Sequence, residues 1–420
     1  MSRALNAALA GTALTVAALP AAAQEGPLRL AMHYAPDQAA PILACLDRYE
    51  AETGQGVEYQ HISYSDYLQT VLTGRLAGQA PDIYNIYSIW GAQMADNGIL
   101  AEPPAEIVDY VREAYAEGTV EAASIDGTLF GIPTEVSVYM LVSNMDLLRE
   151  AGFDEPPTDW AGVLEVGRAV ATRNDQGRLA NAGFAYGDSV AGSVHPFYAL
   201  LLSRGAPIYE EGFAAANFDS PEAEAALADM AATVSEGITS DAVDAFDFPA
   251  GGIGMMIMAN WFEADLRAGF GDRFDEAVRV SQIPAGEDWR TLQYAFFMGV
   301  DSASPRQEAA WELVRWMNGP ESASTEGGPS CMGEMLGALG ALTANAADTA
   351  ALPAPDGFTA PFAEALASGR AVTQPNVMQA SEIEGLAAIA IDTAMAGEEA
   401  PGETLRELDA EVEGILAEFY

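Results

Sequence analysis

The sequence has 420 residues, half of them hydrophobic in type, and its 62 acidic and 18 basic residues give a formal net charge of −44. This acidic surplus repels nucleic acid and anionic membrane surfaces, so both are excluded as partners. The length suits two lobes with separate cores. Every basic residue is arginine, and with the acidic surplus this predicts a protein of saline surroundings, where salt screens its self-repulsion.

The first residues are typical of an export signal. Arg3 gives a short basic start, residues 4–19 are apolar, and the alanines at 21–23 match the small-residue cleavage rule. We therefore expect residues 1–23 to be removed as a signal peptide. No cysteine follows that site to carry a lipid, and no later run is long and apolar enough to cross a bilayer. The mature protein is expected to be soluble and periplasmic.

The segment after the signal alternates strands with helices. We expect strands over residues 28–33, 57–62 and 83–86 and helices over residues 39–53, 67–76 and 91–97. The glycines Gly54 and Gly98 stand where the first and last of these helices should end. This alternation predicts a doubly wound α/β sheet.

The rest of the chain continues with the same kinds of segment. We expect helices over residues 144–151, 160–172, 194–203, 221–237 and 260–268 and strands over residues 252–259, 278–284 and 296–300. Ser304 before Pro305 predicts the start of a helix over residues 306–318. Residues 320–360 are rich in Gly, Ala, Ser and Pro, which predicts a connector with little secondary structure. Final helices are expected over residues 361–367, 381–396 and 403–419.

Five groups of residues, in this order, resemble the type 1 extracellular solute-binding proteins of ABC importers, the family that includes maltose-binding protein. They are residues 80–83 with 98–100, residues 126–133, residues 144–148 with 151–152, residues 254–256 with Trp261, and residues 304–316. The resemblance covers nearly the whole mature chain. It implies the α/β periplasmic binding protein fold, in which two doubly wound lobes are joined by a multi-strand hinge and hold a ligand in the cleft between them.

The resemblance also implies boundaries and a function. The expected N-lobe is residues 24–133 plus 286–320, and the expected C-lobe is residues 134–285 plus 321–420. Chain crossings are expected at residues 131–133, 280–286 and 319–328. The implied function is capture of a sugar or similar polyhydroxylated solute and delivery to ABC permease subunits in the inner membrane. The protein would act as a monomer without a cofactor and would not be an enzyme.

Two rings stand at the corner that follows the third expected strand. Ligands bind beyond the carboxyl ends of strands in open α/β sheets, and Tyr87 and Trp90 fall at such an end. A sugar has flat C–H faces and a rim of hydroxyls, so its site needs rings together with carboxylates and amides. Burial of both rings in the core is the equal alternative. The charged residue usual at this corner of the family is missing here.

Other candidate ligand-binding residues come from strand ends and from the resemblance. Trp261, which follows the strand at 252–259, is the first expected stacking ring, and Glu135 matches the family's acidic position at the first crossing; its alternative is a solvated surface carboxylate. The ends of the first two strands contribute His33, Tyr34, Tyr64 and Asp66. Lower-ranked candidates are Tyr139, His195, Tyr294 and Asn376, the last in a loop where the family often has an aromatic.

Cys45 and Cys331 are the only cysteines. In an oxidising exported compartment this pair is a disulfide candidate. The alternative is two buried small hydrophobic side chains, because Cys45 lies among apolar residues of an expected helix face. No residues near either cysteine have the spacing of zinc ligands.

Two other functions stay open at the level of sequence. A receptor of the same fold for a metal or for an anion such as glycerol phosphate is one, because His33 and His61 both end expected strands; an anion would need arginine at the cleft, and Arg75, Arg204 and Arg290 lie away from those strand ends. A secreted carbohydrate-active hydrolase is the other. It is disfavoured because the usual nucleophile, phosphate-loop and zinc motifs are missing, but two carboxylates could serve a glycosidase.

Overall fold

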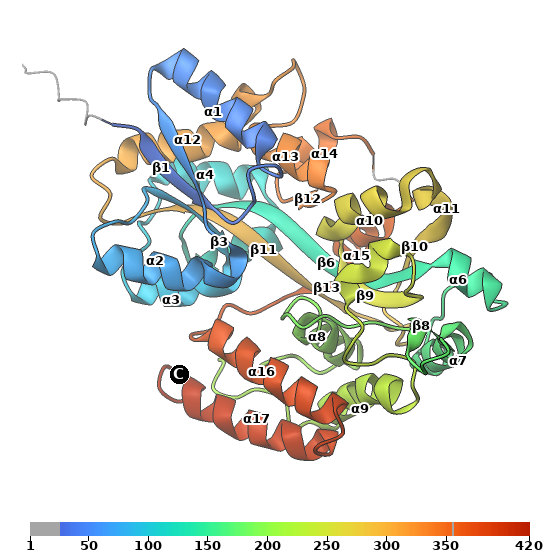
Figure 1. Cartoon of the computed structure of the whole chain (residues 1–420). Helices are drawn as coiled ribbons and strands as arrows, with labels where there is room; N and C mark the ends of the chain where they lie inside the picture. The colour runs from blue at the N-terminus through green and yellow to red at the C-terminus, as the bar shows by residue number, and fades with distance from the viewer. Residues whose placement is uncertain (1–25, 355–356) are drawn as a thin grey trace, which may run out of the picture.

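The structure, a computed structural model, describes residues 26–354 and 357–420. The expected signal peptide, residues 1–23, lies outside the described residues. Across the described ranges, no helix has both the length and the apolar character needed to span a membrane. The chain folds into α/β layers in which one large sheet runs through the molecule (Figure 1).

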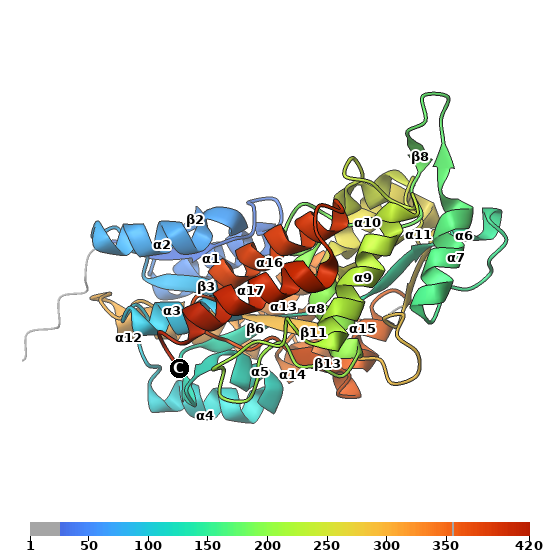
Figure 2. The same ribbon diagram turned by 90° about the horizontal axis from the view of Figure 1, so that it is seen from below.

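The large sheet has nine strands, six of which follow the order β10-β6-β11-β3-β1-β2. Its strands are β1 (Leu28–Met32), β2 (Val57–His61), β3 (Ile83–Tyr87), β6 (Ile132–Asn144), β9 (Met255–Ala259), β10 (Val278–Ser281), β11 (Thr291–Val300), β12 (Leu342–Thr343) and β13 (Ala371–Thr373). Two small hairpins add β4 (Ser124–Ile125) with β5 (Thr128–Leu129) and β7 (Thr172–Arg173) with β8 (Leu179–Asn181). The β7–β8 hairpin projects from the body of the molecule (Figure 2).

In the first lobe β1 lies between β2 and β3 and is parallel to both. The helices of this part are α1 (Ala40–Thr53), α2 (Tyr67–Leu76), α3 (Gly91–Asp96), α4 (Ala105–Ala114), α5 (Glu117–Ala122) and α12 (Gln307–Met317). Figure 1 shows α1 and α12 on one side of β1 and β3 and α2 and α3 on the other. Because parallel strands covered on both faces are buried, all five residues of β3 are buried, including the polar Asn85. The expected doubly wound arrangement is confirmed here.

The second lobe is built on the outer half of β6. Residues Tyr139–Ser143 of β6 pair with β9, and residues Leu141–Asn144 pair with β10, both antiparallel. The surrounding helices are α6 (Met145–Glu150), α7 (Trp160–Val170), α8 (Val194–Ser203), α9 (Pro221–Ser235), α10 (Glu263–Phe270), α11 (Phe274–Ala277), α15 (Ala360–Ala367), α16 (Ala380–Met395) and α17 (Pro401–Leu416). The last two pack beside α9 (Figure 1).

Two long strands connect these halves. The inner part of β6 pairs with β11 from Ile132 to Val138 before its outer part joins the second lobe. The first expected crossing, residues 131–133, therefore stands at the start of β6. The chain returns along β11, whose later residues pair with β3.

The expectation of a connector with little secondary structure over residues 320–360 is wrong. This segment contains α13 (Cys331–Leu339), β12 and α14 (Ala346–Ala351). Ser330 begins α13 because its side-chain oxygen accepts a hydrogen bond from the backbone N–H of Gly333 at 3.1 Å. Met332, Met335 and Leu336 are buried at helical spacing. The glycines and serines of this segment obscured that short apolar pattern.

Cys45 of α1 and Cys331 of α13 form a disulfide, with their Cα atoms 6.0 Å apart. Both side chains are fully buried. Next to the bond, the guanidinium of Arg48 donates to the backbone carbonyl of Ser322 at 2.8 Å. The bond thus joins α1 to the segment that follows α12.

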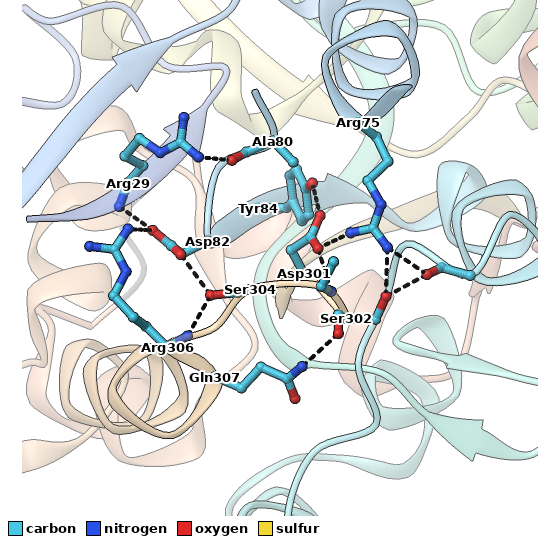
Figure 3. Close-up of polar contacts among 12 residues, drawn as sticks. Arg29, Arg75, Ala80, Asp82, Tyr84, Asp301, Ser302, Ser304, Arg306 and Gln307 are labelled. Atoms are coloured by element: carbon cyan, nitrogen blue, oxygen red, sulfur yellow. Dashed lines mark hydrogen bonds and ion pairs between the residues drawn. The ribbon is translucent and has the colours of Figure 1, made fainter. Parts of the chain in front are cut away.

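A polar network closes the amino ends of β1 and β3 (Figure 3). Asp82 accepts from the Arg306 guanidinium at 2.5 Å, and its carboxyl group is almost fully buried. At the end of β11, Asp301 pairs with Arg75 and accepts from the Tyr84 hydroxyl at 2.5 Å. These charges are satisfied within the first lobe, so the opposite ends of the same strands are the ones left for a ligand.

Candidate functional site

Three strands of the sheet end in a short 3₁₀ turn that carries an aromatic side chain. β2 is followed, after Ile62 and Ser63, by the turn Tyr64–Asp66, β3 is followed directly by Ser88–Trp90, and β9 directly by Asn260–Phe262. An α-helix then continues from each turn. This local pattern places Tyr64, Trp90 and Trp261 at the carboxyl ends of their strands.

Aromatic side chains from both lobes meet at these strand ends, and we call them the ring cluster. The ring cluster consists of His33, Tyr34, Tyr64, Tyr87, Trp90, Tyr139, His195, Tyr294 and Phe296. Eight of these residues were candidates from the sequence, and the structure brings them together. Phe296 was not among them. The available signal was the alternation of Tyr294 and Phe296, which puts both rings on one face of β11, but the expected strand began only at Phe296.

Tyr87 occupies the centre of the ring cluster. Its ring centroid lies 5.0 Å from that of Tyr294, 5.3 Å from Phe296, 5.5 Å from Trp90 and 5.8 Å from Tyr64. The pairing of β11 with β6 shifts register around Phe296. Such a bulge bends a strand and redirects a side chain. Edge-to-face and offset ring pairs at these separations stabilise one another by about 0.5 to 1.5 kcal/mol beyond the area they bury.

A chain of hydrogen bonds links the centre of the cluster to the second lobe. The Tyr87 hydroxyl donates to Gln374 Oε1 at 2.8 Å, and Gln374 Nε2 donates to Glu384 Oε1 at 2.6 Å. His195 Nε2 lies 3.1 Å from the same Glu384 oxygen, and Nδ1 lies 2.7 Å from the Tyr139 hydroxyl. The sequence did not single out Gln374 or Glu384.

Glu135 lies on the inner part of β6 and is only 3% exposed. Its carboxylate accepts from the Tyr34 hydroxyl and, at 2.7 Å, from the Ser137 hydroxyl. Burial raises the pKa of Glu135 above its ordinary value, and these two hydrogen bonds oppose that rise. The alternative of a solvated surface carboxylate is therefore wrong.

His33 is half-buried at the end of β1. Its ring stacks on Phe296 with centroids 4.5 Å apart, and its Nδ1 lies 2.7 Å from Asn85 Oδ1. Burial lowers the pKa of His33 to about 4; the contact with Asn85 opposes this, and the charge of His61 adds to it. At neutral pH the ring is therefore uncharged.

Trp261 lies at the margin of the cluster. Its ring contacts are with Phe246 and Phe262, at 6.2 and 5.7 Å. The phenol of Tyr294 has a pKa well above its ordinary value. Burial is the main cause of this rise, the charge of Glu135 adds to the rise, and hydrogen bonding that involves Ser137, Trp261 and Tyr139 opposes it. The indole N–H of Trp261 nevertheless has no hydrogen-bond partner of good geometry among the described residues. A polar ligand would satisfy it.

Besides Glu135 and Trp261, two candidates lie outside the ring cluster. Asp66 is exposed and accepts from the Ser63 hydroxyl at 2.7 Å, so the structure gives it a local role at the start of α2. Asn376 accepts from the backbone N–H of Ala92 at 3.0 Å. It therefore binds the start of α3 and joins the loop before α16 to the first lobe.

No arginine in the described part of the chain hydrogen-bonds or ion-pairs with a residue of the ring cluster. Within residues 26–354 and 357–420, no three His, Cys, Asp or Glu side chains are grouped to hold a metal ion. Two shallow hollows of about 430 and 420 Å³ lie on α17 and between α9 and the end of α16. Neither hollow includes a ring-cluster residue.

Comparison with known proteins agrees with this arrangement. A model of the bacterial extracellular solute-binding protein family matches residues 35–324. A protein of Brucella abortus (strain 2308), named as a binding protein, is 22% identical over 320 residues, which cover 72% of this chain and 75% of the relative.

Solved structures of similar proteins share the fold. The sugar-binding protein MalE from Xanthomonas citri is 18% identical with a TM-score of 0.75, over 94% of this chain and 98% of its own. The Thermus thermophilus maltotriose binding protein, bound with maltotriose, is 17% identical with a TM-score of 0.77, over 93% and 100%. An ABC transporter solute binding protein from Thermotoga lettingae TMO, bound with α-D-tagatose, is 18% identical with a TM-score of 0.78, over 93% and 100%. The expected fold class, the two-lobed α/β periplasmic binding protein fold, is confirmed.

Proposed function

Because the chain belongs to the bacterial extracellular solute-binding protein family, we propose that it captures a sugar or similar polyhydroxylated solute between its lobes and delivers it to an ABC permease. The observation that carries this proposal is the ring cluster, whose members hydrogen-bond to the carboxylates of Glu135 and Glu384 and to the amide of Gln374. Rings cover the C–H faces of a sugar, and Glu135, Glu384 and Gln374 can bind its hydroxyls. The sugar-bound relatives support the same reading.

Capture would depend on movement of the lobes. With the N-lobe taken as residues 24–133 plus 286–320 and the C-lobe as residues 134–285 plus 321–420, the pairs Tyr34 with Glu135 and Tyr87 with His195 join opposite lobes. A solute reaches these groups only when the lobes separate. Contacts from both lobes would then favour the closed form, and the permease would recognise that form.

The remaining parts of the proposal follow from this role. The protein would be exported to the periplasm after loss of residues 1–23, would act as a monomer, and would release its solute chemically unchanged. Three features support a non-catalytic role. The family and the similar structures are binding proteins, the carboxylates Glu135 and Glu384 already accept hydrogen bonds from neighbouring side chains, and the sequence lacks the hydrolase motifs named above.

Thermal shift and calorimetry on the mature protein test this function. A panel of mono- and oligosaccharides, polyols, glycerol phosphates and divalent metals should raise the unfolding midpoint only for carbohydrate or polyol members, because a ligand of the folded state stabilises it. Trp261→Ala should weaken binding of the responding member by about 1 to 3 kcal/mol. Trp289→Ala is the matched control, since Trp289 packs under Arg370 away from the cluster. A response to metals or phosphates alone would refute the sugar assignment.

A further inference from the structure

The loop between β13 and α16, residues 374–379, is anchored at both ends. At its first end β13 pairs with β11, the strand that connects the two halves, and the backbone N–H of Gln374 donates to the carbonyl of Gln293 at 2.8 Å. At its second end the backbone N–H of Met378 donates to the phenol oxygen of Tyr420 at 3.0 Å. The residues between these anchors are thereby held in one position.

Asn376, between the two anchors, contacts the first lobe. Its side-chain oxygen accepts from the backbone N–H of Ala92 at the start of α3, at 3.0 Å. A Cβ at the neighbouring Gly91 would stand 2.9 Å from Asn376 Nδ2, closer than side-chain carbons come in proteins, while its next neighbours, in Ile125 and Phe297, would lie at 3.2 and 3.4 Å. Gly91 thus leaves a notch that the Asn376 amide fills.

The backbone at Gly91 does not itself require glycine. Its φ of −58° and ψ of −46° are ordinary helical values. Alanine adopts these values readily and favours a helix more than glycine does. The main obstacle to a side chain at this position is therefore the amide of Asn376, which comes from the other lobe.

The bond between Asn376 and Ala92 joins the lobes directly, with no solute atom in between. The same holds for the bond between Tyr87 and Gln374 at the start of the loop. Contacts of this kind stabilise the closed form before a solute arrives. The apparent affinity for a solute that needs a given form rises with the fraction of molecules already in that form.

We infer, on the basis of the proposed movement of the lobes, that residues 374–379 are an interlobe latch. Asn376 docks in the notch at Gly91 and keeps part of the unliganded protein closed. The ring cluster selects the solute, and the latch sets how tightly the selected solute is held. Docking of Asn376 also brings Gln374, two residues earlier, to the Tyr87 hydroxyl.

The distance between two spin labels, measured on the mature protein without sugar, tests the latch. Thr70→Cys on α2 and Ala225→Cys on α9 put the labels at exposed positions of opposite lobes, and the native cysteines are bonded to each other. The labelled protein should show a closed and an open separation. Gly91→Ala and Asn376→Ala should each lower the ratio of closed to open molecules by about two- to tenfold, the range for one neutral hydrogen bond.

A double variant shows whether both changes act on one contact. Because Gly91→Ala acts by striking the Asn376 side chain, combining it with Asn376→Ala should lower the ratio no further than the stronger single change does. Gly414→Ala is the matched control, since this glycine lies in α17 and its Cβ would have no neighbour within 4 Å. The control should leave the ratio unchanged.

Three results would overturn the latch: a parent protein that shows only the open separation, a ratio that neither single variant changes, or additive effects in the double variant. Each of them leaves the proposed function standing, because no sugar takes part in the measurement. The proposed function fails separately, if no carbohydrate or polyol raises the unfolding midpoint in the thermal-shift panel.

Discussion

Replacing the His33 side chain should reduce the decrease in the free energy of unfolding that accompanies a fall in pH below neutral. The pKa of His33 falls from 6.5 to about 4 on folding. Below pH 6.5 the unfolded chain therefore binds a proton that the folded chain does not, and stability is lost as the pH falls from 6.5 towards 4. A shift of about 2.5 pKa units at about 1.36 kcal/mol each is about 3 kcal/mol, an upper figure because the ring is partly solvated.

His33→Gln keeps a side-chain amide near Asn85 but cannot be protonated. Urea unfolding followed by tryptophan fluorescence, at constant ionic strength and several pH values from 7.5 to 4, gives the free energy of unfolding for both proteins. The difference between wild type and variant should be constant above about pH 7 and should change by up to about 3 kcal/mol, in favour of the variant, by pH 4. Parallel profiles would refute the assignment of a buried neutral imidazole. His61→Gln controls for loss of an exposed imidazole from the same lobe, and the same change there would remove His33 as the cause.

Three further predictions concern stability. Replacing Cys45 and Cys331 together by serine should lower the free energy of unfolding by up to about 5 kcal/mol, since the bond closes a loop with a sequence separation of 286; an unchanged urea midpoint would contradict this. Asp301→Asn should lower the free energy of unfolding by about 3 kcal/mol, because Arg75 and Tyr84 lose a buried charged partner. A decrease of less than about 1 kcal/mol, measured by calorimetric unfolding, would contradict this prediction. Raising salt to marine concentration should raise the unfolding midpoint of this chain of net charge −44; a flat salt dependence would exclude the saline-habitat hypothesis.

The sequence was most informative where local pattern and topology coincide. Strand-end reasoning found His33, Tyr34 and Tyr87 because the carboxyl ends of parallel strands share one edge of a sheet. The resemblance was needed for Glu135, whose burial depends on the pairing of β6 with β11 and β12. Local pattern alone would predict that Glu135 is a surface carboxylate.

Other parts of the site depend on tertiary packing that no local pattern records. Glu384 stands within an amphipathic helix, where a carboxylate is usually solvated, and only the docking of α16 against the cluster buries it. Gln374 lies in an irregular loop beside β13. The helix α13 was missed for a different reason: its glycines obscured an apolar face that is buried by packing against α1, α10 and β12.

The disulfide between Cys45 and Cys331 joins two helices, α1 and α13, that are far apart in the sequence. Although α13 follows residue 320, where the resemblance places the C-lobe, it is bonded covalently to α1 of the first lobe. Under the proposed separation of the lobes, a bend that leaves this bond in place would fall after Leu339, in the stretch around β12 that pairs with Val136 and Glu135. The proposed opening would then bend the chain beside the residue that we propose binds the hydroxyls of the solute.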